Sequence, residues 1–358
     1  MLLSAFAVDA GQTAEDAYLP ELSPDPRTVT RLAAQGISTL HVFEIAFTAV
    51  IFGLNASLGL TGIAGVRAAC ICGAVWMAIF ATWSLKKMAP RAAAQTLPPG
   101  TGVLTAGYVV LRKSVRGIWV DYPMALRLLV GHMFLSAAVG AVISLATVFM
   151  VSFLEVSFTW VGIVFGLAMV GGLPGAVLAT WLARHMSLKR VTIATCVFWA
   201  STFWVSPWVL TPEDTKTRTM LLVLFSLLWG MGLGMVFTAP KAFFVTIVPG
   251  GREAEFMGIQ KLFGKSLSWL PPLIYTLINE STGGNMQLAM FSLNFFFLAA
   301  AASFATVDYQ KAVAQVKPTL LSRAYSAASD KNKIKVHPED DRKMVAGTCT
   351  LAADDDNG

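Results

Sequence analysis

The chain has 358 residues, of which 55% are hydrophobic and only 13% are charged. A soluble domain carries about 25% charged residues, so this composition excludes an ordinary soluble protein. The formal net charge is +6, but the basic residues lie between apolar runs, a pattern typical of membrane topology rather than of nucleic-acid binding. We therefore expect a lipid bilayer, and no nucleic acid, as the partner.

Apolar runs long enough to cross a membrane recur along the whole chain. A span needs about 20 apolar residues, and strands of alternating polarity, which a β-barrel requires, are not seen. The sequence therefore predicts an all-α, polytopic helical membrane protein with about eight transmembrane helices. The predicted spans are 38–60, 63–85, 126–150, 158–182, 190–210, 219–239, 255–278 and 286–307.

The remaining segments are polar. Residues 1–37 contain Pro20, Pro24 and Pro26, residues 86–125 form a long basic connection, and residues 308–358 form a tail that we expect to be disordered. Lysines and arginines gather in 86–125 and in the connections near 184–190 and 240–255. These three connections alternate so as to share one side of the membrane, which the positive-inside rule predicts to be the cytosol.

The spacing of the spans predicts an unequal division of the chain. Two spans (38–85), a central loop (86–125) and six further spans (126–307) fit the last two helices of one half-bundle followed by a complete six-helix second half-bundle. On this interpretation four helices precede residue 1 in the complete carrier. We then expect the eight-span chain alone not to transport.

Two charged or polar positions lie within the first predicted span. Glu44 lies one turn after His41, and a charge near the bilayer centre costs about 2.5–3.5 kcal/mol on insertion scales. Both residues either face a cavity or partner, or reach water at the cytosolic edge. Asn55, deeper in the span, either binds a substrate or hydrogen-bonds a neighbouring helix.

Later spans contain further candidates. His132 either relays protons or contacts a substrate, or is hydrogen-bonded to a neighbouring helix. Gln260 and Lys265 lie down the seventh span, which Pro271 and Pro272 are expected to interrupt, as in helices that flank transport paths. Glycines spaced four apart, at 162/166, 171/175 and 230/234, predict close packing of helix backbones.

Charged residues begin the seventh span. Glu253 and Glu255 fit the first turn of a helix, where acids favour the helix dipole by about 0.3–1 kcal/mol each. The alternative is a cytosolic gate in which these acids and Arg252 form ion pairs between the two halves. No phosphate-binding glycine loop, metal-ligand spacing or nucleophile motif is present, so we expect no enzyme activity, no cofactor and no metal.

The string Gly251-Arg252-Glu253-Ala254-Glu255-Phe256 resembles the autophagy-related vacuolar amino-acid effluxers of the major facilitator superfamily. Further matches are Gly264-Lys265-Ser266, Ser268-Trp269, Thr282-Gly283, Tyr18-Leu19-Pro20-Glu21-Leu22, and Arg67 with the stretch 74–80. The similarity runs from about residue 16 to residue 307. Ser136 and Ala137 stand where the family pattern has an Asn-Asp pair.

The resemblance implies a truncated major-facilitator bundle in a vacuolar or lysosomal membrane. It implies alternating access and the efflux of small solutes, namely neutral amino acids released by autophagy. Path candidates are Asn55, His132, Gln260 and Lys265, and gate candidates are Arg252, Glu253 and Glu255. The alternative is a non-transporting membrane scaffold, or a fragment of such a carrier that pairs with another chain.

Overall fold

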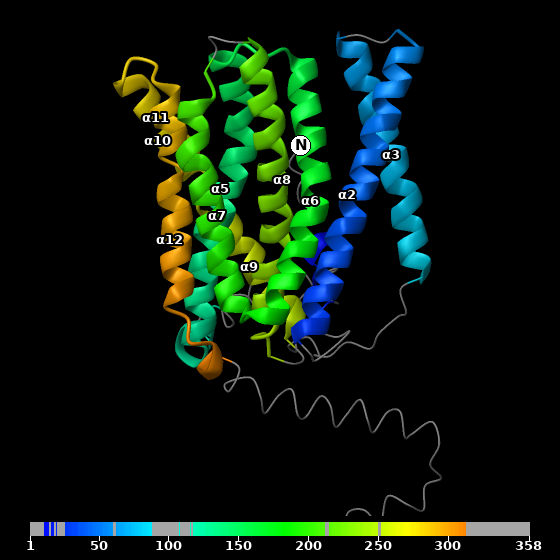
Figure 1. Cartoon of the computed structure of the whole chain (residues 1–358). Helices are drawn as coiled ribbons and strands as arrows, with labels where there is room; N and C mark the ends of the chain where they lie inside the picture. The colour runs from blue at the N-terminus through cyan, green and yellow to red at the C-terminus, as the bar shows by residue number, and fades with distance from the viewer. Residues whose placement is uncertain are drawn as a thin grey trace, which may run out of the picture.

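The computed structural model describes residues 11–13, 16–17, 19, 26–59, 62–87, 107, 115, 117–211, 215–249 and 252–312. Within these residues the protein is helical and no strand is present, which confirms the predicted fold class. Figure 1 shows the helices standing side by side. Their bounds are α2 Pro26–Ser57, α3 Gly62–Lys87, α5 Pro123–Val148, α6 Phe158–His185, α7 Leu188–Val209, α8 Thr215–Val245, α9 Glu253–Ser266, α10 Leu270–Ser281, α11 Met286–Phe291 and α12 Asn294–Ala305.

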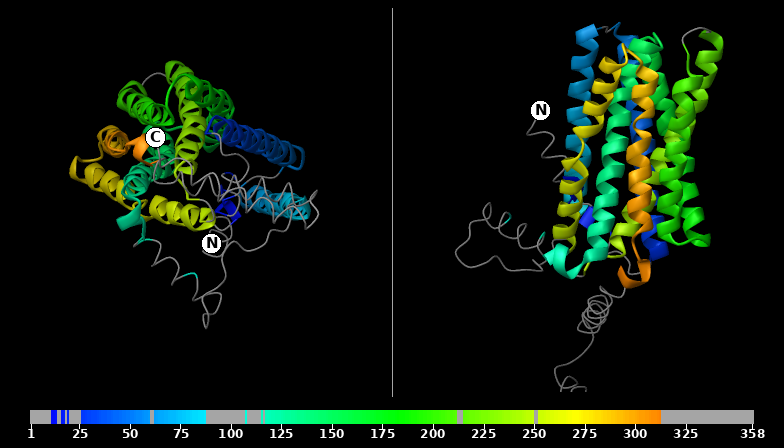
Figure 2. Two further views of the ribbon diagram at one scale, coloured as in Figure 1. Left: turned by 90° about the horizontal axis from the view of Figure 1, so that it is seen from below. Right: turned by 90° about the vertical axis from the view of Figure 1, so that its left-hand side faces the viewer.

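Six stretches of the described residues are long and apolar enough to cross a membrane. They are Arg27–Ser57, Arg67–Lys87, Pro123–Phe153, Phe158–His185, Lys216–Val245 and Met286–Ala305. Each corresponds to one predicted span. The other two predicted spans correspond to α7, which has 22 residues, and to the pair α9 and α10, which follow one another along the bundle in Figures 1 and 2.

Two elements differ from their predicted bounds. Helix α2 begins at Pro26, well before the predicted span at residue 38, because proline is well tolerated in the first turn of a helix. The predicted span 255–278 is divided into α9 and α10, with the interruption at 267–269 and Pro271 and Pro272 in the first turn of α10. The prolines cannot donate backbone hydrogen bonds, which explains the interruption.

The basic connections meet at one end of the bundle. In Figure 1 the carboxyl ends of α3, α6, α8 and α12 and the amino ends of α2, α5, α7 and α9 all lie at the lower end. We call this the basic end. The shared position agrees with the alternation that the lysines and arginines predict.

Glycines bring α6 and α8 into backbone contact. A Cβ added at Gly175 would overlap the carbonyl of Met231, and one added at Gly230 would overlap the carbonyl of Ala168. Gly171 and Gly234 are equally crowded by the facing backbone. The predicted close packing is therefore confirmed for the pairs 171/175 and 230/234, where only a hydrogen fits between the two helices.

Aromatic rings fill the interior of the six-helix group formed by α5 to α12. Trp199 stacks on Phe203 and on Phe297, with ring centroids 5.4 Å apart in both cases, and Phe203 stacks on Trp229 at 5.6 Å. Trp199 and Phe203 are almost completely buried. Helices α2 and α3 stand to one side of this group in Figure 1, with α2 packed on α6 and α8.

Candidate functional site

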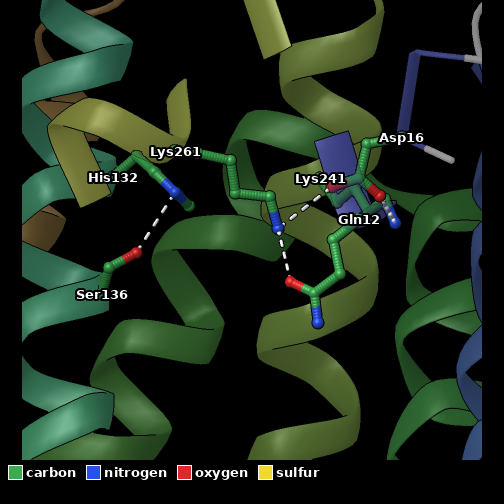
Figure 3. A network of polar contacts seen from close by, with 6 residues as sticks. All are labelled: Gln12, Asp16, His132, Ser136, Lys241 and Lys261. Carbon is green, nitrogen blue, oxygen red and sulfur yellow. Dashed lines mark hydrogen bonds and ion pairs between the residues drawn. The ribbon is translucent and has the colours of Figure 1, made fainter. Parts of the chain in front are cut away.

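A buried carboxylate joins three separate segments near the basic end. Asp16, from the segment before α2, forms ion pairs with Lys241 at the end of α8 and with Lys261 in α9. The distance from Lys261 Nζ to Asp16 Oδ2 is 3.2 Å, and Lys261 Nζ also donates a hydrogen bond to Gln12 Oε1 at 3.1 Å. Figure 3 shows the four side chains converging on one point. We call Gln12, Asp16, Lys241 and Lys261 the basic-end network.

The network connects the N-terminal segment to the six-helix group. Asp16 and Gln12 lie in the predicted segment 1–37, whereas Lys241 and Lys261 belong to the six-helix group. Only 7% of Asp16 is exposed. Burying an isolated carboxylate is costly, so the two lysines stabilise this side chain in its buried position. Separating the N-terminal segment from the six-helix group would break all three contacts together.

A second polar group lies where α5 crosses α9. His132 Nε2 and Ser136 Oγ are 3.1 Å apart on one face of α5. A Cβ added at Gly264 of α9 would lie 3.2 Å from Ser136 Oγ and 3.3 Å from His132 Nε2. The glycine therefore lets α9 approach these two side chains closely. Within the described residues His132 Nδ1 is buried without a hydrogen-bond partner.

The predicted path residues divide between two places. Gln260 is buried on the same face of α9 as Gly264, four residues away, so it belongs with His132 at the contact between α5 and α9. Lys265 follows Gly264 and is exposed. Asn55 lies on α2, away from the other three, and its Oδ1 is buried without a partner among the described residues.

The predicted gate residues lie at the start of α9. Arg252 donates through Nε to Glu255 Oε2 at 2.9 Å and also pairs with Glu255 through Nη2, and its guanidinium lies 5.4 Å from the centre of the Phe256 ring. The hydrogen bond to Glu255 raises the pKa of Arg252 above its usual value. Glu253 is buried in the first turn. The ion pair of Arg252 thus lies within its own helical turn, and its guanidinium also hydrogen-bonds the side chain of Tyr122 at the start of α5. The described ion pairs with the N-terminal segment are made by Asp16.

Sequence reasoning missed the basic-end network. Lys241 lies in the basic connection near 240–255, Lys261 lies in the predicted span 255–278, and Asp16 lies in the polar segment 1–37. The usable signal was chemical, because a cation in an apolar helix needs an anion. No spacing rule, however, connects positions 16, 241 and 261. Among the described residues no cluster of His, Cys, Asp and Glu could hold a metal ion.

Comparison with known proteins adds independent information. A family model described as "Vacuole effluxer Atg22 like" matches residues 8–317. No curated protein matches the chain. Two solved structures are similar over most of their length. The E. coli fucose:proton symporter FucP has a TM-score of 0.48 and 14% identity, covering 83% of this chain and 73% of its own.

The second structure is a bacterial homologue of the human lysosomal transporter Spinster, in an inward-facing and unoccupied conformation. Its TM-score is 0.40 and its identity 17%, covering 80% of this chain and 69% of its own.

Proposed function

Because the chain belongs to the vacuole effluxer Atg22-like family of membrane transporters, we propose that it moves neutral amino acids across a vacuolar or lysosomal membrane. The solutes would be those released by autophagic breakdown. The mechanism would be alternating access, in which one part of the bundle rocks against the other around a site near the middle of the membrane. The family match supports the transporter class, and the substrate and mechanism are our proposal.

The basic-end network is the observation that supports alternating access most directly. A carrier of this kind must hold one end closed while the other is open, and it must be able to release that closure. Asp16 of the N-terminal segment forms its ion pairs with Lys241 and Lys261 of the six-helix group at the basic end. We propose that this network is the closed gate on the predicted cytosolic side. Arg252, Glu253 and Glu255 would then support the gate by fixing the start of α9.

The candidate path residues suit a small zwitterion. A neutral amino acid needs a hydrogen-bond acceptor for its ammonium group and a donor for its carboxylate. The amide of Gln260 and the amide of Asn55 offer both, the ring of His132 offers one of each, and Lys265 offers a cation. We propose that these four side chains line the path as the two parts move, with His132 and Gln260 next to one another on the α5–α9 contact.

Counterflow of labelled leucine tests the proposal. Proteoliposomes containing the purified chain and unlabelled leucine should take up labelled leucine faster than protein-free liposomes. This outcome would overturn the expectation, drawn from the spacing of the spans, that the eight-span chain alone does not transport. Gln260→Leu and His132→Leu should reduce this exchange to near the protein-free rate. Gln310→Leu is the matched control, because Gln310 is exposed beyond α12, and it should exchange like the unchanged chain.

The test also separates the two functional classes that the sequence allowed. If the folded chain exchanges none of a panel of neutral amino acids, the transport proposal for this chain is wrong. That outcome would favour the scaffold, or a fragment that requires a second chain. Co-reconstitution with a separately expressed four-helix segment of a related carrier would then distinguish these two.

A further inference from the structure

The contact between α2 and α6 contains an ionisable pair outside the network described above. His41 Nδ1 and Glu44 Oε2, one turn apart on α2, are 3.0 Å apart. Only 6% of the His41 side chain is exposed, whereas 39% of the Glu44 side chain is. In a contact of this length a neutral imidazole with its proton on Nδ1 donates to an ionised carboxylate, and either group can then accept a further proton. The pair therefore holds two adjacent groups that bind protons.

The pair lies in the middle of the membrane span. Helix α2 has 32 residues, and at 1.5 Å per residue His41 is about 22 Å from its first residue. Where α2 contacts α6, His41 lies next to Gly172, which is near the middle of the 28-residue α6. A titratable group at this depth is expensive, and in membrane proteins such groups serve mainly as proton relays or ligand contacts.

The imidazole is held tightly against α6. A Cβ added at Gly172 would come within 2.5 Å of His41 Nε2. Within the described residues Nε2 is buried and has no hydrogen-bond partner. An arrangement that served only to join two helices would pair this nitrogen with a group on α6. Instead one ring nitrogen faces a glycine, and the other faces a carboxylate whose side chain is 39% exposed.

A polar stripe connects the pair to the end of α2 opposite the basic end. Thr48 and Asn55 follow Glu44 at positions 4 and 11 along the helix, so His41, Glu44, Thr48 and Asn55 share one face. All four are at least partly buried, while the residues on the other faces of this stretch are mostly exposed and apolar. Asn55 Oδ1 also lacks a partner among the described residues. These side chains place hydrogen-bonding groups at intervals between the pair and that end of α2.

The surroundings leave the pair isolated from other charges. Described titratable residues of the packed elements lie toward the helix ends, apart from two thiols of α3. They are Arg184 and His185 on α6, Lys216, Arg218 and Lys241 on α8, Arg67, Cys70, Cys72, Lys86 and Lys87 on α3, and Arg27 and Arg31 on α2 itself. A change in the protonation of the pair is therefore not compensated by a neighbouring ion within the span.

We propose that His41 and Glu44 form the proton-binding site of this carrier, so that solute movement is coupled to proton movement. In each cycle a proton from the solution at the end near Asn55 binds to the Glu44 carboxylate and is shared with His41. When the bundle rocks and α2 shifts against α6, the same proton leaves to the other side. No bond other than that to the proton changes. This inference rests on the proposed transport function.

The binding site can be tested without any substrate. Infrared difference spectra of the protein in lipid, recorded between about pH 8 and about pH 5, should contain a protonated-carboxyl band that Glu44→Gln removes and His41→Gln shifts. Gly172→Ala, which pushes a methyl group against His41, should also shift the band. Gly166→Ala is the matched control, because a Cβ there meets nothing within 4 Å. Identical spectra for the unchanged chain and Glu44→Gln would overturn the proposal.

Coupling is tested separately in proteoliposomes that contain a trapped pH dye. Leucine flux through the unchanged chain should move protons. Glu44→Gln should abolish proton movement and uptake driven by a pH gradient but should retain leucine counterflow. Counterflow without proton movement in the unchanged chain would overturn the coupling and leave transport intact. If counterflow itself is absent, the proposed function fails, and the infrared band still decides whether the proton site exists.

Discussion

The six-helix group and the α2–α3 pair differ in how they use their apolar residues. The spanning window of Pro123–Phe153 is 56% buried inside the protein, and the windows of the other spans in the group are 39–44% buried. The window of Arg27–Ser57 is 6% buried and that of Arg67–Lys87 is 0% buried. The six-helix group is therefore held together by its own packing. The α2–α3 pair instead has few fully buried residues in its spans, and α2 packs on α6 and α8 mostly through half-buried side chains.

The comparison predicts that equal substitutions have unequal effects in the two regions. Trp199→Ala should cost about 3–5 kcal/mol of unfolding free energy, because it removes a buried ring stacked on two others and leaves a cavity. Trp83→Ala in α3, where 62% of the side chain is exposed, should cost about 0.5 kcal/mol or less. Unfolding titrations in mixed micelles measure both. Equal losses of unfolding free energy in the two variants would contradict the conclusion that the two regions differ in their packing.

Glycine substitutions sharpen the same contrast. Gly230→Ala places a methyl group on the backbone of Ala168 and should cost about 2–3 kcal/mol, because neither backbone can move freely. Gly53→Ala in α2 meets nothing within 4 Å and should be neutral or slightly stabilising, by about 0.5 kcal/mol, since alanine favours the helix. The thermal midpoints of the two variants in one detergent would show the sign of each change.

The basic-end network, which joins the N-terminal segment to the six-helix group, should have an intermediate effect. Asp16→Asn leaves Lys241 and Lys261 without their anion and should cost about 1–2 kcal/mol, less than a fully buried pair because both lysines are partly exposed. The larger consequence should be opening of the basic end, measured as faster thiol labelling of a cysteine placed near residue 241.

A charge-reversed control separates loss of the network from general damage. Asp16→Lys combined with Lys261→Asp retains one pair of opposite charges and should recover part of the closure. If the double variant labels as fast as Asp16→Asn, the contact between residues 16 and 261 does not hold the gate closed.

The smallest expected effect concerns the α2–α3 pair itself. Phe43 contacts Trp76 and Phe80, with ring centroids 6.2 and 5.1 Å apart, and Phe47 contacts Trp76 at 5.6 Å. Trp76→Ala should therefore weaken the pairing of the two helices by about 1 kcal/mol. Disulfide cross-linking between cysteines placed on α2 and α3 would report this, and the unfolding of the six-helix group should not change.

The sequence predicted the helices because hydrophobic length and loop charge are local properties. The predicted interruption near Pro271 and the glycine packing of α6 on α8 were confirmed because proline and glycine act through their own backbone. The start of α2 was placed too late, since Pro26 was interpreted as a helix breaker although proline suits a first turn.

The candidate site was less accessible to sequence reasoning. The sequence predicted the gate at Arg252, Glu253 and Glu255. The ion pair described there, between Arg252 and Glu255, lies within one helical turn. The basic-end network connects residue 16 of the N-terminal segment with residues 241 and 261, and such a pairing depends on how the chain returns on itself. The same limit applies to His41, whose proximity to Gly172 requires two antiparallel helices to be in register.

Two basic side chains also bind the carboxyl end of α12. Arg127 donates to the carbonyl of Thr306 at 3.0 Å and Lys189 donates to the carbonyl of Ala305 at 2.7 Å, so side chains from α5 and from the start of α7 both cap the end of α12. Cations at a helix carboxyl end satisfy carbonyls that have no partner in the helix. The arginine and lysine that the positive-inside rule assigns to the predicted cytosolic side thus also link α5, α7 and α12 into one block. Replacing them with cations of shorter reach would keep the charge of this end and remove the links between the three helices.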